Sequence, residues 1–373
     1  MVNQKPMRIA AVDVYPLEIP FTDGGAGIGL TPVRRWDSFE TVLLRITTDD
    51  GQTGWGEAFA YACQSSVAEA VRHMVAPLLI GRDASDPATL MLDIQRKLHL
   101  FGRYGITMFA ISGADIALWD LKARSVGMSL AALLGTPLRQ QVSAYASLVR
   151  YADPALVERF AAEAVSAGYR SVKLHEIDPA IIHAGRRGAG PGTHLTVDVN
   201  CAWSLAECRT VLPALEAAEL AWLEEPLFPP EDFDALAELA GETRIPLAAG
   251  ENACTGYEFA RMIRSAGARY PQPSVTKVGG VTEFMAVLRD AASHGLTCMP
   301  HSPYFGPGYW ATLQLLAHAA GEPLLEVLYV SPEAMPGLDT PMPLQGSVII
   351  PAGPGIGFKP DWDVFERYAA RAG

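Results

Sequence analysis

Three stretches of the chain each place a carboxylate directly after a short apolar run. Asp198 follows the run in HLTVDVN, Glu224 that in AWLEEP and Glu251 that in IPLAAGE, at spacings of 26 and 27 residues. One strand and one helix fill about that length, so the spacing predicts that the three carboxylates end consecutive parallel strands and converge. Carboxylates gathered in a low-dielectric site repel one another unless a cation holds them, and an all-oxygen set suits Mg²⁺, or Mn²⁺ in its place.

Each of these carboxylates has an alternative interpretation when it is taken singly. Acidic residues at strand ends often cap the next helix, where they accept hydrogen bonds from backbone N–H groups. The equal spacing on consecutive strands favours metal binding over three separate caps. Glu225 directly follows Glu224 and would point to the other side of an extended backbone. We therefore expect Glu225 to support the site and not to bind the metal.

Side chains that can transfer a proton follow other apolar runs. Lys173 and His175 alternate with apolar residues in SVKLHEI and therefore share a face, and His301 follows TCMP. Basic groups on either side of a metal suit removal of a proton alpha to a carboxylate, because the metal offsets the charge on the enediolate oxygens. As alternatives, Lys173 could pair with Glu176, and His301 could be a buried structural histidine. Glu326, in LLEVL, would donate a hydrogen bond to the oxyanion if neutral and would otherwise cap a strand.

The elements that would position these side chains form a regular series. From Val142 onward, eight short apolar strands alternate with helical stretches: VSAYASL, SVKLHEI, LTVDVN, AWLEEP, PLAAGE, SVTKVGG, TCMPHS and LLEVLY. Eight such units in a row predict a (β/α)₈ TIM-type barrel, in which every strand delivers its last residues to the same face. An open doubly wound sheet is the alternative, and the absence of a GxGxxG motif after any strand disfavours it.

A different pattern precedes the barrel. Residues 7–57 alternate apolar and polar residues, with Asp50-Gly51 as a hairpin signal, and predict an antiparallel meander. Helical periodicity follows from about residue 65 and stops at Gly135. We therefore predict an α+β capping domain over residues 1–137, a catalytic (β/α)₈ barrel over 138–330, and a C-terminal segment over 331–373 that completes the capping domain.

The composition of the chain limits the classes of partner that we expect it to bind. The chain has 373 residues, of which 49% are hydrophobic, and a net charge of -12, which disfavours nucleic acid and anionic membrane surfaces as partners. A small molecule is the expected partner.

The five cysteines are widely spaced and never form a CxxC pair, so we expect free thiols and a cytoplasmic location. No apolar run approaches the roughly 20 residues of a membrane helix, and the first residues lack an export signal, so neither membrane insertion nor export is expected.

Taken together, these stretches resemble the enolase superfamily, and within it the mandelate racemase/muconate lactonizing enzyme family. The resemblance includes SGADIALWDLKARSVGMSLAALLG, VDVNCAW, LEEP, GEN, KVGGVTE and the closing PAGPGIG. It implies a modified barrel with an N-terminal cap, and Mg²⁺ bound by Asp198, Glu224 and Glu251. Lys173 and His175 occupy the positions of the family's K-x-K motif, whose second member is commonly the base. Because the second member is histidine here, either residue could take the proton.

One position departs from the family pattern. The mandelate racemase-like branch usually carries an aspartate on the sixth strand that orients the catalytic histidine of the seventh, and Ser274 stands there. A serine supplies no charge to raise the basicity of His301, so His301 would work better as an acid toward a leaving group. Lys277 matches a lysine that is also present in mandelate racemase and is expected to support substrate binding. Glu326 matches the acid that contacts the substrate carboxylate.

The resemblance also suggests how a substrate is selected. The first domain of such proteins covers the barrel mouth with loops, here about residues 21–36 and 55–64. On these loops, Arg34, Trp36 and Tyr61 could bind a polyhydroxylated or anionic distal end of a substrate.

The expected reaction is dehydration of a sugar acid to a 2-keto-3-deoxy acid, because the missing aspartate favours acid catalysis. A racemase, epimerase or cycloisomerase is the alternative, and a silent carboxylate-binding protein a third. The resemblance further implies a homo-oligomer, often an octamer or dimer.

Overall fold

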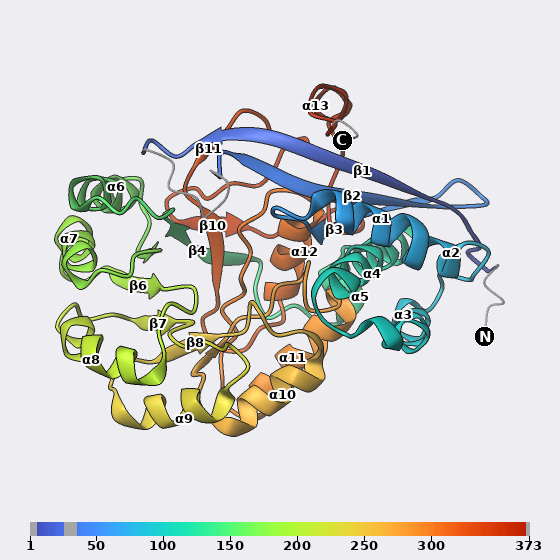
Figure 1. The fold of residues 1–373 in the computed structure, drawn as a ribbon. Helices are drawn as coiled ribbons and strands as arrows, with labels where there is room; N and C mark the ends of the chain where they lie inside the picture. Colours follow the sequence, from blue (N-terminus) through green and yellow to red (C-terminus); the bar gives the residue numbers. More distant parts are fainter. Residues whose placement is uncertain (1–5, 26–35, 371–373) are drawn as a thin grey trace.

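Parallel strands in the second half of the chain curl into a barrel (Figure 1). The computed structural model describes residues 6–25 and 36–370. Strand β10 (Leu324–Leu328) pairs with β4 (Gln141–Ser147), and the sheet then continues in chain order. The following strands are β5 (Ser171–Leu174), β6 (His194–Asp198), β7 (Trp222–Glu224), β8 (Leu247–Ala249) and β9 (Tyr270–Pro271). The predicted barrel fold is confirmed, with the modification described next.

Two of the eight predicted strands are wrong. The sixth strand is β9, at Tyr270–Pro271, and the predicted SVTKVGG segment instead forms turns that lead into a helix. Pro273 has no N–H group, so it cannot continue the ladder of hydrogen bonds. The predicted seventh strand, TCMPHS, is irregular and joins β9 through one backbone bond, from the Met299 N–H to the Pro271 carbonyl at 3.0 Å. Pro300 limits further pairing there for the same reason.

Helices cover the outside of the barrel. Several begin at a side chain that accepts a hydrogen bond from the backbone of the first turn, as Asp153, Asp178, Ser204 and Asp232 do. The helices are α6 (Pro154–Ser166), α7 (Pro179–Ala189), α8 (Leu205–Glu216), α9 (Phe233–Glu242), α10 (Thr255–Ser265), α11 (Gly280–Ser293) and α12 (Pro307–Leu316). None of the helices in the described part of the chain combines the length and hydropathy that crossing a membrane requires.

The first part of the chain forms a cap of antiparallel strands and helices beside the barrel. Strands β1 (Ile9–Thr22), β2 (Ser38–Thr48) and β3 (Thr53–Phe59) pair in chain order, and the predicted hairpin joins the last two. Gly56 lies so close to the longest helix that a Cβ atom would collide with the Gly113 carbonyl. The helical elements are α1 (Gln64–Ala70), η1 (Val71–Val75), α2 (Ala76–Leu79), α3 (Pro87–Lys97), η2 (His99–Phe101), α4 (Gly105–Ser125) and α5 (Leu130–Leu134).

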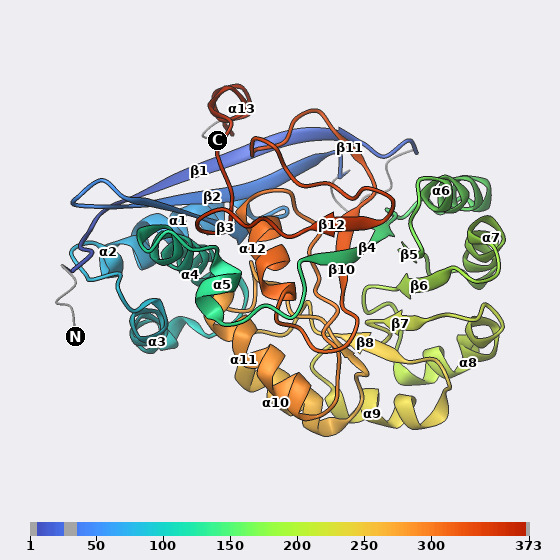
Figure 2. The same ribbon diagram turned by 180° about the vertical axis from the view of Figure 1, so that it is seen from behind.

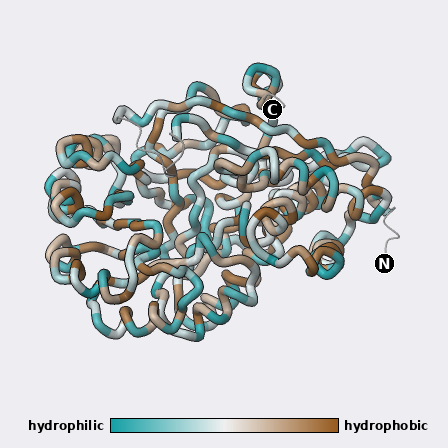
Figure 3. The backbone as a smooth tube through the Cα atoms, in the orientation of Figure 1, coloured by the Kyte–Doolittle hydropathy of each residue, from teal (hydrophilic) through white to brown (hydrophobic). Residues whose placement is uncertain are grey.

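Apolar side chains of β2 and α4 form a buried cluster of their own, separate from the large cluster that fills the barrel and its helices. Figure 3 shows hydrophobic stretches recurring along both parts of the molecule, with hydrophilic stretches between them. This alternation reflects helices and strands that each bury one face.

The last segment contacts both the barrel and the cap (Figure 2). Strand β12 (Ser347–Ile349) pairs with β4 of the barrel, and β11 (Ser331–Pro332) pairs with β1 of the cap. Near helix α13 (Trp362–Arg367), the Glu18 N–H donates to the Tyr368 carbonyl at 2.9 Å. The C-terminal segment thus completes the cap, as predicted for the fold, while the division of the chain at residues 137 and 330 stays a prediction.

A buried carboxylate joins the cap to the barrel. Glu57, on β3, accepts hydrogen bonds from the Thr41 hydroxyl at 2.6 Å and from the Gly308 N–H, in the first turn of α12, at 2.8 Å. Its side chain has no contact with bulk water, because the residue is 3% exposed. Burial raises the pKa of Glu57 from 4.5 to about 7, and the two donors only partly oppose this.

The raised pKa of Glu57 predicts that the free energy of unfolding falls as the pH rises, and that Glu57→Gln removes this dependence. The folded state holds the Glu57 proton more tightly than the unfolded state, so the wild-type chain loses stability as pH rises from about 4.5 to 7, by up to about 3 kcal/mol. Glu57→Gln keeps an acceptor for Gly308. The melting temperature of Glu57→Gln minus that of wild type should therefore be larger at pH 8 than at pH 5. Glu69→Gln, at an exposed site, serves as the control, and a difference that does not vary with pH would contradict the assignment.

Candidate active site

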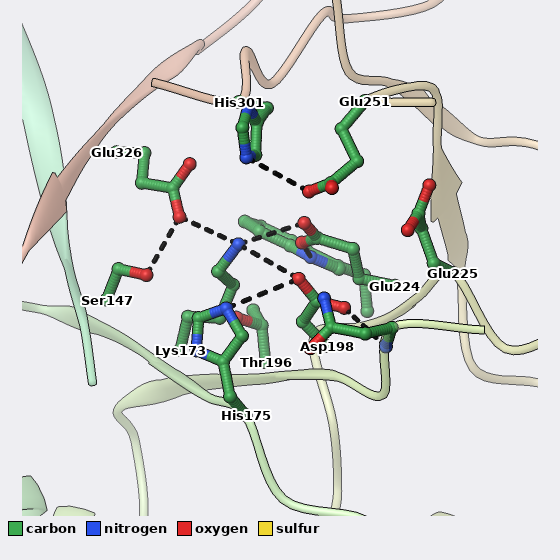
Figure 4. A network of polar contacts seen from close by, with 12 residues as sticks. Ser147, Lys173, His175, Thr196, Asp198, Glu224, Glu225, Glu251, His301 and Glu326 are labelled. Carbon is green, nitrogen blue, oxygen red and sulfur yellow. Dashed lines mark hydrogen bonds and ion pairs between the residues drawn. The ribbon is translucent and has the colours of Figure 1, made fainter. Parts of the chain in front are cut away.

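The three predicted carboxylates meet at the barrel mouth. Asp198 and Glu224 end the neighbouring strands β6 and β7 and are paired in register, and Glu251 lies two residues beyond β8. One oxygen atom from each carboxylate lies within 4.8 Å of the others (Figure 4). The equal spacing in the sequence therefore corresponds to convergence in space, because each β/α unit returns the chain to the same face of the barrel.

Lys173 lies at the centre of the acidic cluster. Its Nζ atom is 2.7 Å from Glu326 Oε1, 2.9 Å from Glu224 Oε1 and 3.4 Å from Asp198 Oδ2 (Figure 4). Burial favours the neutral amine, but the surrounding carboxylates outweigh burial and hold the pKa of Lys173 well above its usual value. The amine is therefore a fixed cation in this arrangement and has no lone pair with which to accept a proton.

His175 is oriented by two neighbours. Its Nδ1 atom lies 2.5 Å from the Leu148 carbonyl oxygen, and its Nε2 atom lies 3.4 Å from Asp198 Oδ2. A carbonyl oxygen can only accept, so Nδ1 carries a proton and Nε2 is the nitrogen that can take one up. Burial lowers the affinity of the ring for a proton, but the Asp198 carboxylate outweighs it, and the pKa of His175 is raised.

His301 contacts a different member of the carboxylate set. Its Nε2 atom lies 3.1 Å from Glu251 Oε2, while its buried Nδ1 atom has no hydrogen-bond partner among the residues that the structure describes. Ser274 lies against Tyr304 instead, with its Oγ atom 3.2 Å from the Tyr304 hydroxyl. Burial lowers the pKa of His301 to about 3. The Nδ1 atom of His301 therefore lacks, within the described part of the chain, the carboxylate partner that would form a His-Asp pair, and Glu251 contacts the ring only at Nε2.

The neighbours of Glu326 hold its carboxylate in place as a hydrogen-bond acceptor. Its carboxylate accepts hydrogen bonds from the Ser147 hydroxyl and from the Ser302 N–H, both at 2.8 Å, in addition to the Lys173 ion pair. Burial disfavours ionisation, but Lys173 outweighs it, and the pKa of Glu326 is lowered. The alternative in which a neutral Glu326 donates a hydrogen bond is therefore not favoured by this arrangement.

Two residues near Glu251 support its surroundings. Lys277 Nζ is 3.8 Å from Glu251 Oε1 and 4.8 Å from the centre of the Phe59 ring. Glu225, whose φ of 44° turns it out of the strand, accepts hydrogen bonds from the Asn252 amide at 2.9 and 3.0 Å. Glu225 is not among the three carboxylates whose oxygens converge. Because its backbone is not extended, the alternation assumed from the sequence does not apply to it, and its supporting role stays a prediction.

The charge balance of this cluster fits a divalent cation. The cluster contains five carboxylates and two ammonium groups: Asp198, Glu224, Glu225, Glu251, Glu326, Lys173 and Lys277. With all five carboxylates ionised, three negative charges are left over in a largely buried site. Burial opposes that state, because it raises the pKa of Glu224 to about 8 and that of Glu225 well above its usual value, so full ionisation requires a further cation. Three converging carboxylates with an excess of negative charge match the hard, all-oxygen ligand set of Mg²⁺ or Mn²⁺.

A cavity of about 350 Å³ opens beside these groups. This volume is in the range of small-molecule sites. The predicted residues His175, Glu251, His301 and Glu326 line the cavity together with Trp36 and Tyr61 of the cap. Lys173 and Lys277 are not among its lining residues, and Arg34 lies outside the described residues.

The sequence reasoning missed two polar residues of the cavity wall, Arg150 and Asn200. Arg150 lies three residues beyond the end of β4, and Asn200 lies two residues beyond the end of β6. The rule that residues following barrel strands line the mouth applies to both positions.

Comparisons with known proteins agree with this geometry. A family model for the mandelate racemase / muconate lactonizing enzyme N-terminal domain matches residues 33–135, and an enolase C-terminal domain-like model matches 156–364. The chain is 29% identical to D-galactarolactone cycloisomerase of Agrobacterium fabrum, over 97% of this chain and 99% of the relative. It is 31% identical to D-galactonate dehydratase of Verminephrobacter eiseniae, over 71% of this chain and 72% of the relative.

Solved structures with a similar fold come from the same family. The crystal structure of a racemase from Streptomyces coelicolor A3(2) with bound magnesium is 26% identical and superposes with a TM-score of 0.87, over 97% of this chain and 100% of that chain. Cap, barrel and motifs agree over nearly the whole length, so the chain belongs to the mandelate racemase/muconate lactonizing enzyme family of the enolase superfamily.

Proposed function

We propose that this protein is a Mg²⁺-dependent lyase that dehydrates a sugar acid to a 2-keto-3-deoxy acid. The observation that carries the proposal is the placement of two imidazoles in one cavity, His175 against Asp198 and His301 against Glu251. A base and an acid that reach one small substrate from different sides are what an elimination requires. The names of two relatives, D-galactonate dehydratase and arabinonate dehydratase, support the same chemistry.

Asp198, Glu224 and Glu251 would hold the cation. When bound, it would supply the positive charge that offsets the charge developing on the substrate carboxylate as the alpha proton leaves. The protein contributes a fixed arrangement of these ligands, since the Trp222 indole N–H donates to Glu224 Oε2 at 3.0 Å and the Asn200 N–H donates to Asp198 Oδ1 at 2.8 Å.

His175 is the proposed base. Its Nε2 atom is free to accept because Nδ1 is committed to the Leu148 carbonyl, and its ring lines the cavity. Lys173, which the sequence left as an equal candidate, is enclosed by carboxylates and lines no part of the cavity. We assign Lys173 the role of fixing Glu224 and Glu326, and we assign the proton transfer to His175.

His301 is the proposed acid. The C2–H bond breaks first, reversibly, and its proton passes to His175. The C3–O bond then breaks, and protonated His301 gives a proton to the departing hydroxyl, which leaves as water. The resulting enol gains a proton at C3 and releases the proton of its C2 hydroxyl, which gives the 2-keto acid. Burial lowers the pKa of His301 to about 3, so the protonated ring gives up its proton readily, and the Glu251 carboxylate, 3.1 Å from Nε2, is the contact that would hold the imidazolium before the transfer.

An isomerase that uses the same first step is the alternative. A proton removed from one side and returned from the other would give a racemase or epimerase, and a ring-forming or ring-opening step would give a cycloisomerase. The similarity to a D-galactarolactone cycloisomerase over nearly the full length of both chains favours this candidate. A homo-oligomeric state and a cytoplasmic location stay predictions, and the proposed partner is a small carboxylate substrate.

Histidine variants separate the two proton-transfer roles. His175→Asn should lower both deuterium exchange at C2 and formation of 2-keto acid by about 10²- to 10⁴-fold, because the base is lost. His301→Asn should lower 2-keto acid formation by a similar factor while C2 exchange stays within about tenfold of wild type. Exchange is followed by NMR in D₂O with a panel of sugar acids and Mg²⁺. Retention of exchange in His175→Asn would move the role of base to another group, with Lys173 the next candidate.

Loss of one carboxylate should weaken metal binding. Replacing a group that merely supports a ligand costs about 10- to 100-fold in metal affinity, so Glu251→Gln should raise the Mg²⁺ dissociation constant by at least about 100-fold. Calorimetric titration of the metal-free protein measures this without any substrate. Glu231→Gln, at an exposed position, is the matched control and should bind Mg²⁺ as wild type does. Equal affinities for both variants would remove Glu251 from the ligand set.

A further inference from the structure

The guanidinium of Arg150 lies in the wall of the cavity and is held in place by its neighbours. Its Nε atom donates to the His175 carbonyl at 2.6 Å, and its Nη2 atom donates to Asn200 Oδ1 at 3.3 Å. The side chain is half-buried and lines the same cavity as the two histidines. These bonds fix the plane of the guanidinium and leave N–H groups at its outer edge unused, because an arginine has five donors.

Arg150 has no carboxylate in direct contact within the described part of the chain. The charge of Arg150 acts on Glu176 from farther away, and Glu176 Oε1 instead accepts hydrogen bonds from the Tyr151 and Ala152 N–H groups. No carboxylate of the described residues forms an ion pair with it, and the sequence of residues 26–35 contains no acidic residue. By contrast, Arg45, Arg124, Arg187 and Arg209 pair with carboxylates. Arg139 and Arg186 have no carboxylate of the described residues in contact but donate to three and four backbone carbonyls respectively, whereas Arg150 donates to one. A partly desolvated guanidinium costs free energy unless an anion compensates it, and its planar edge matches a carboxylate. The missing partner is therefore expected to come from the ligand.

The position of Arg150 indicates which carboxylate it binds. Asp198 and Glu224 are the last residues of their strands, whereas Arg150 lies three residues beyond the end of β4. It contacts the backbone of His175, while the imidazole of His175 points to Asp198. Arg150 is thus farther out in the mouth than the groups that receive the reacting end of the substrate.

Resting on the proposed function, we propose that Arg150 binds a second carboxylate at the end of the substrate remote from the reacting carbon. The substrate class is then a sugar diacid, such as a hexaric acid, and not a monoacid whose far end is a hydroxymethyl group. Asn200 fixes the guanidinium for this contact, and its amide can also donate to a neighbouring substrate hydroxyl.

Matched substrates test this assignment. Hexaric acids and the hexonic acids of the same configuration are compared with Mg²⁺-loaded wild type, Arg150→Gln, Arg150→Lys and the exposed control Arg187→Gln. Wild type should prefer the diacid, and Arg150→Gln should lower kcat/KM for the diacid by about 10²-fold while changing that for the monoacid less than about threefold. Arg150→Lys should fall between the two, because a lysine keeps the charge but loses the planar edge.

The outcomes distinguish this inference from the proposed function. An equal loss for both substrates would show that Arg150 acts only through the His175 backbone, and a preference for monoacids in wild type would also overturn the inference while leaving the dehydratase intact. If neither class is turned over or exchanged at C2, the proposed function fails. Calorimetric binding of the hexaric acids then decides the inference: weaker binding by Arg150→Gln than by wild type supports it, and equal binding rejects it.

Discussion

Mutual repulsion among buried carboxylates is the constraint around which this barrel mouth is organised. Charges of the same sign at such distances in a low-dielectric site disfavour one another by several kcal/mol unless each is compensated. The chain compensates them with fixed donors: Lys173 lies between Glu224 and Glu326, backbone N–H groups reach Asp198 and Glu326, and an amide side chain holds Glu225. With every carboxylate ionised, these donors leave a surplus of negative charge, which is why the three converging carboxylates are proposed to bind a divalent cation.

The repulsion among the carboxylates also explains why two neighbouring basic residues are proposed to have different roles. Lys173 lies in β5 and His175 directly follows its last residue, and the alternation in the sequence makes the two residues equivalent candidates. In the folded chain, the lysine lies deeper, where three carboxylates need a permanent positive charge, and an ammonium with a raised pKa supplies it. The histidine lies at the cavity wall, where a group that can change its charge is useful. Depth in the barrel and the type of residue together are therefore the basis for proposing His175, and not Lys173, as the group that transfers the proton.

Much of the fold and the centre of the site could be predicted, because both follow from repeated spacing. Asp198, Glu224 and Glu251 each end a β/α unit, and a barrel has a single face to which such residues can go. The errors lie where one proline changes the backbone: SVTKVGG has the alternation of a strand, but Pro273 ends the ladder before it. Arg150 was missed because no motif surrounds it. Its role depends on the His175 carbonyl and on the lack of a carboxylate of the described residues in direct contact, and neither can be read from spacing.

The contact between Arg150 and His175 links substrate recognition to chemistry within the barrel itself. The cap contributes Trp36 and Tyr61 to the cavity, and the Tyr61 hydroxyl donates to the Pro303 carbonyl, so the cap is fixed to the loop that carries His301. On the other side, the guanidinium of Arg150 is bonded to the backbone carbonyl of His175, the proposed base. If Arg150 binds the remote end of a substrate as proposed, that contact would restrain His175 as well, and binding energy from the far end could orient the reacting groups. This coupling would require no movement of Asp198 and Glu224, whose hydrogen bonds to Asn200 and Trp222 hold them in place.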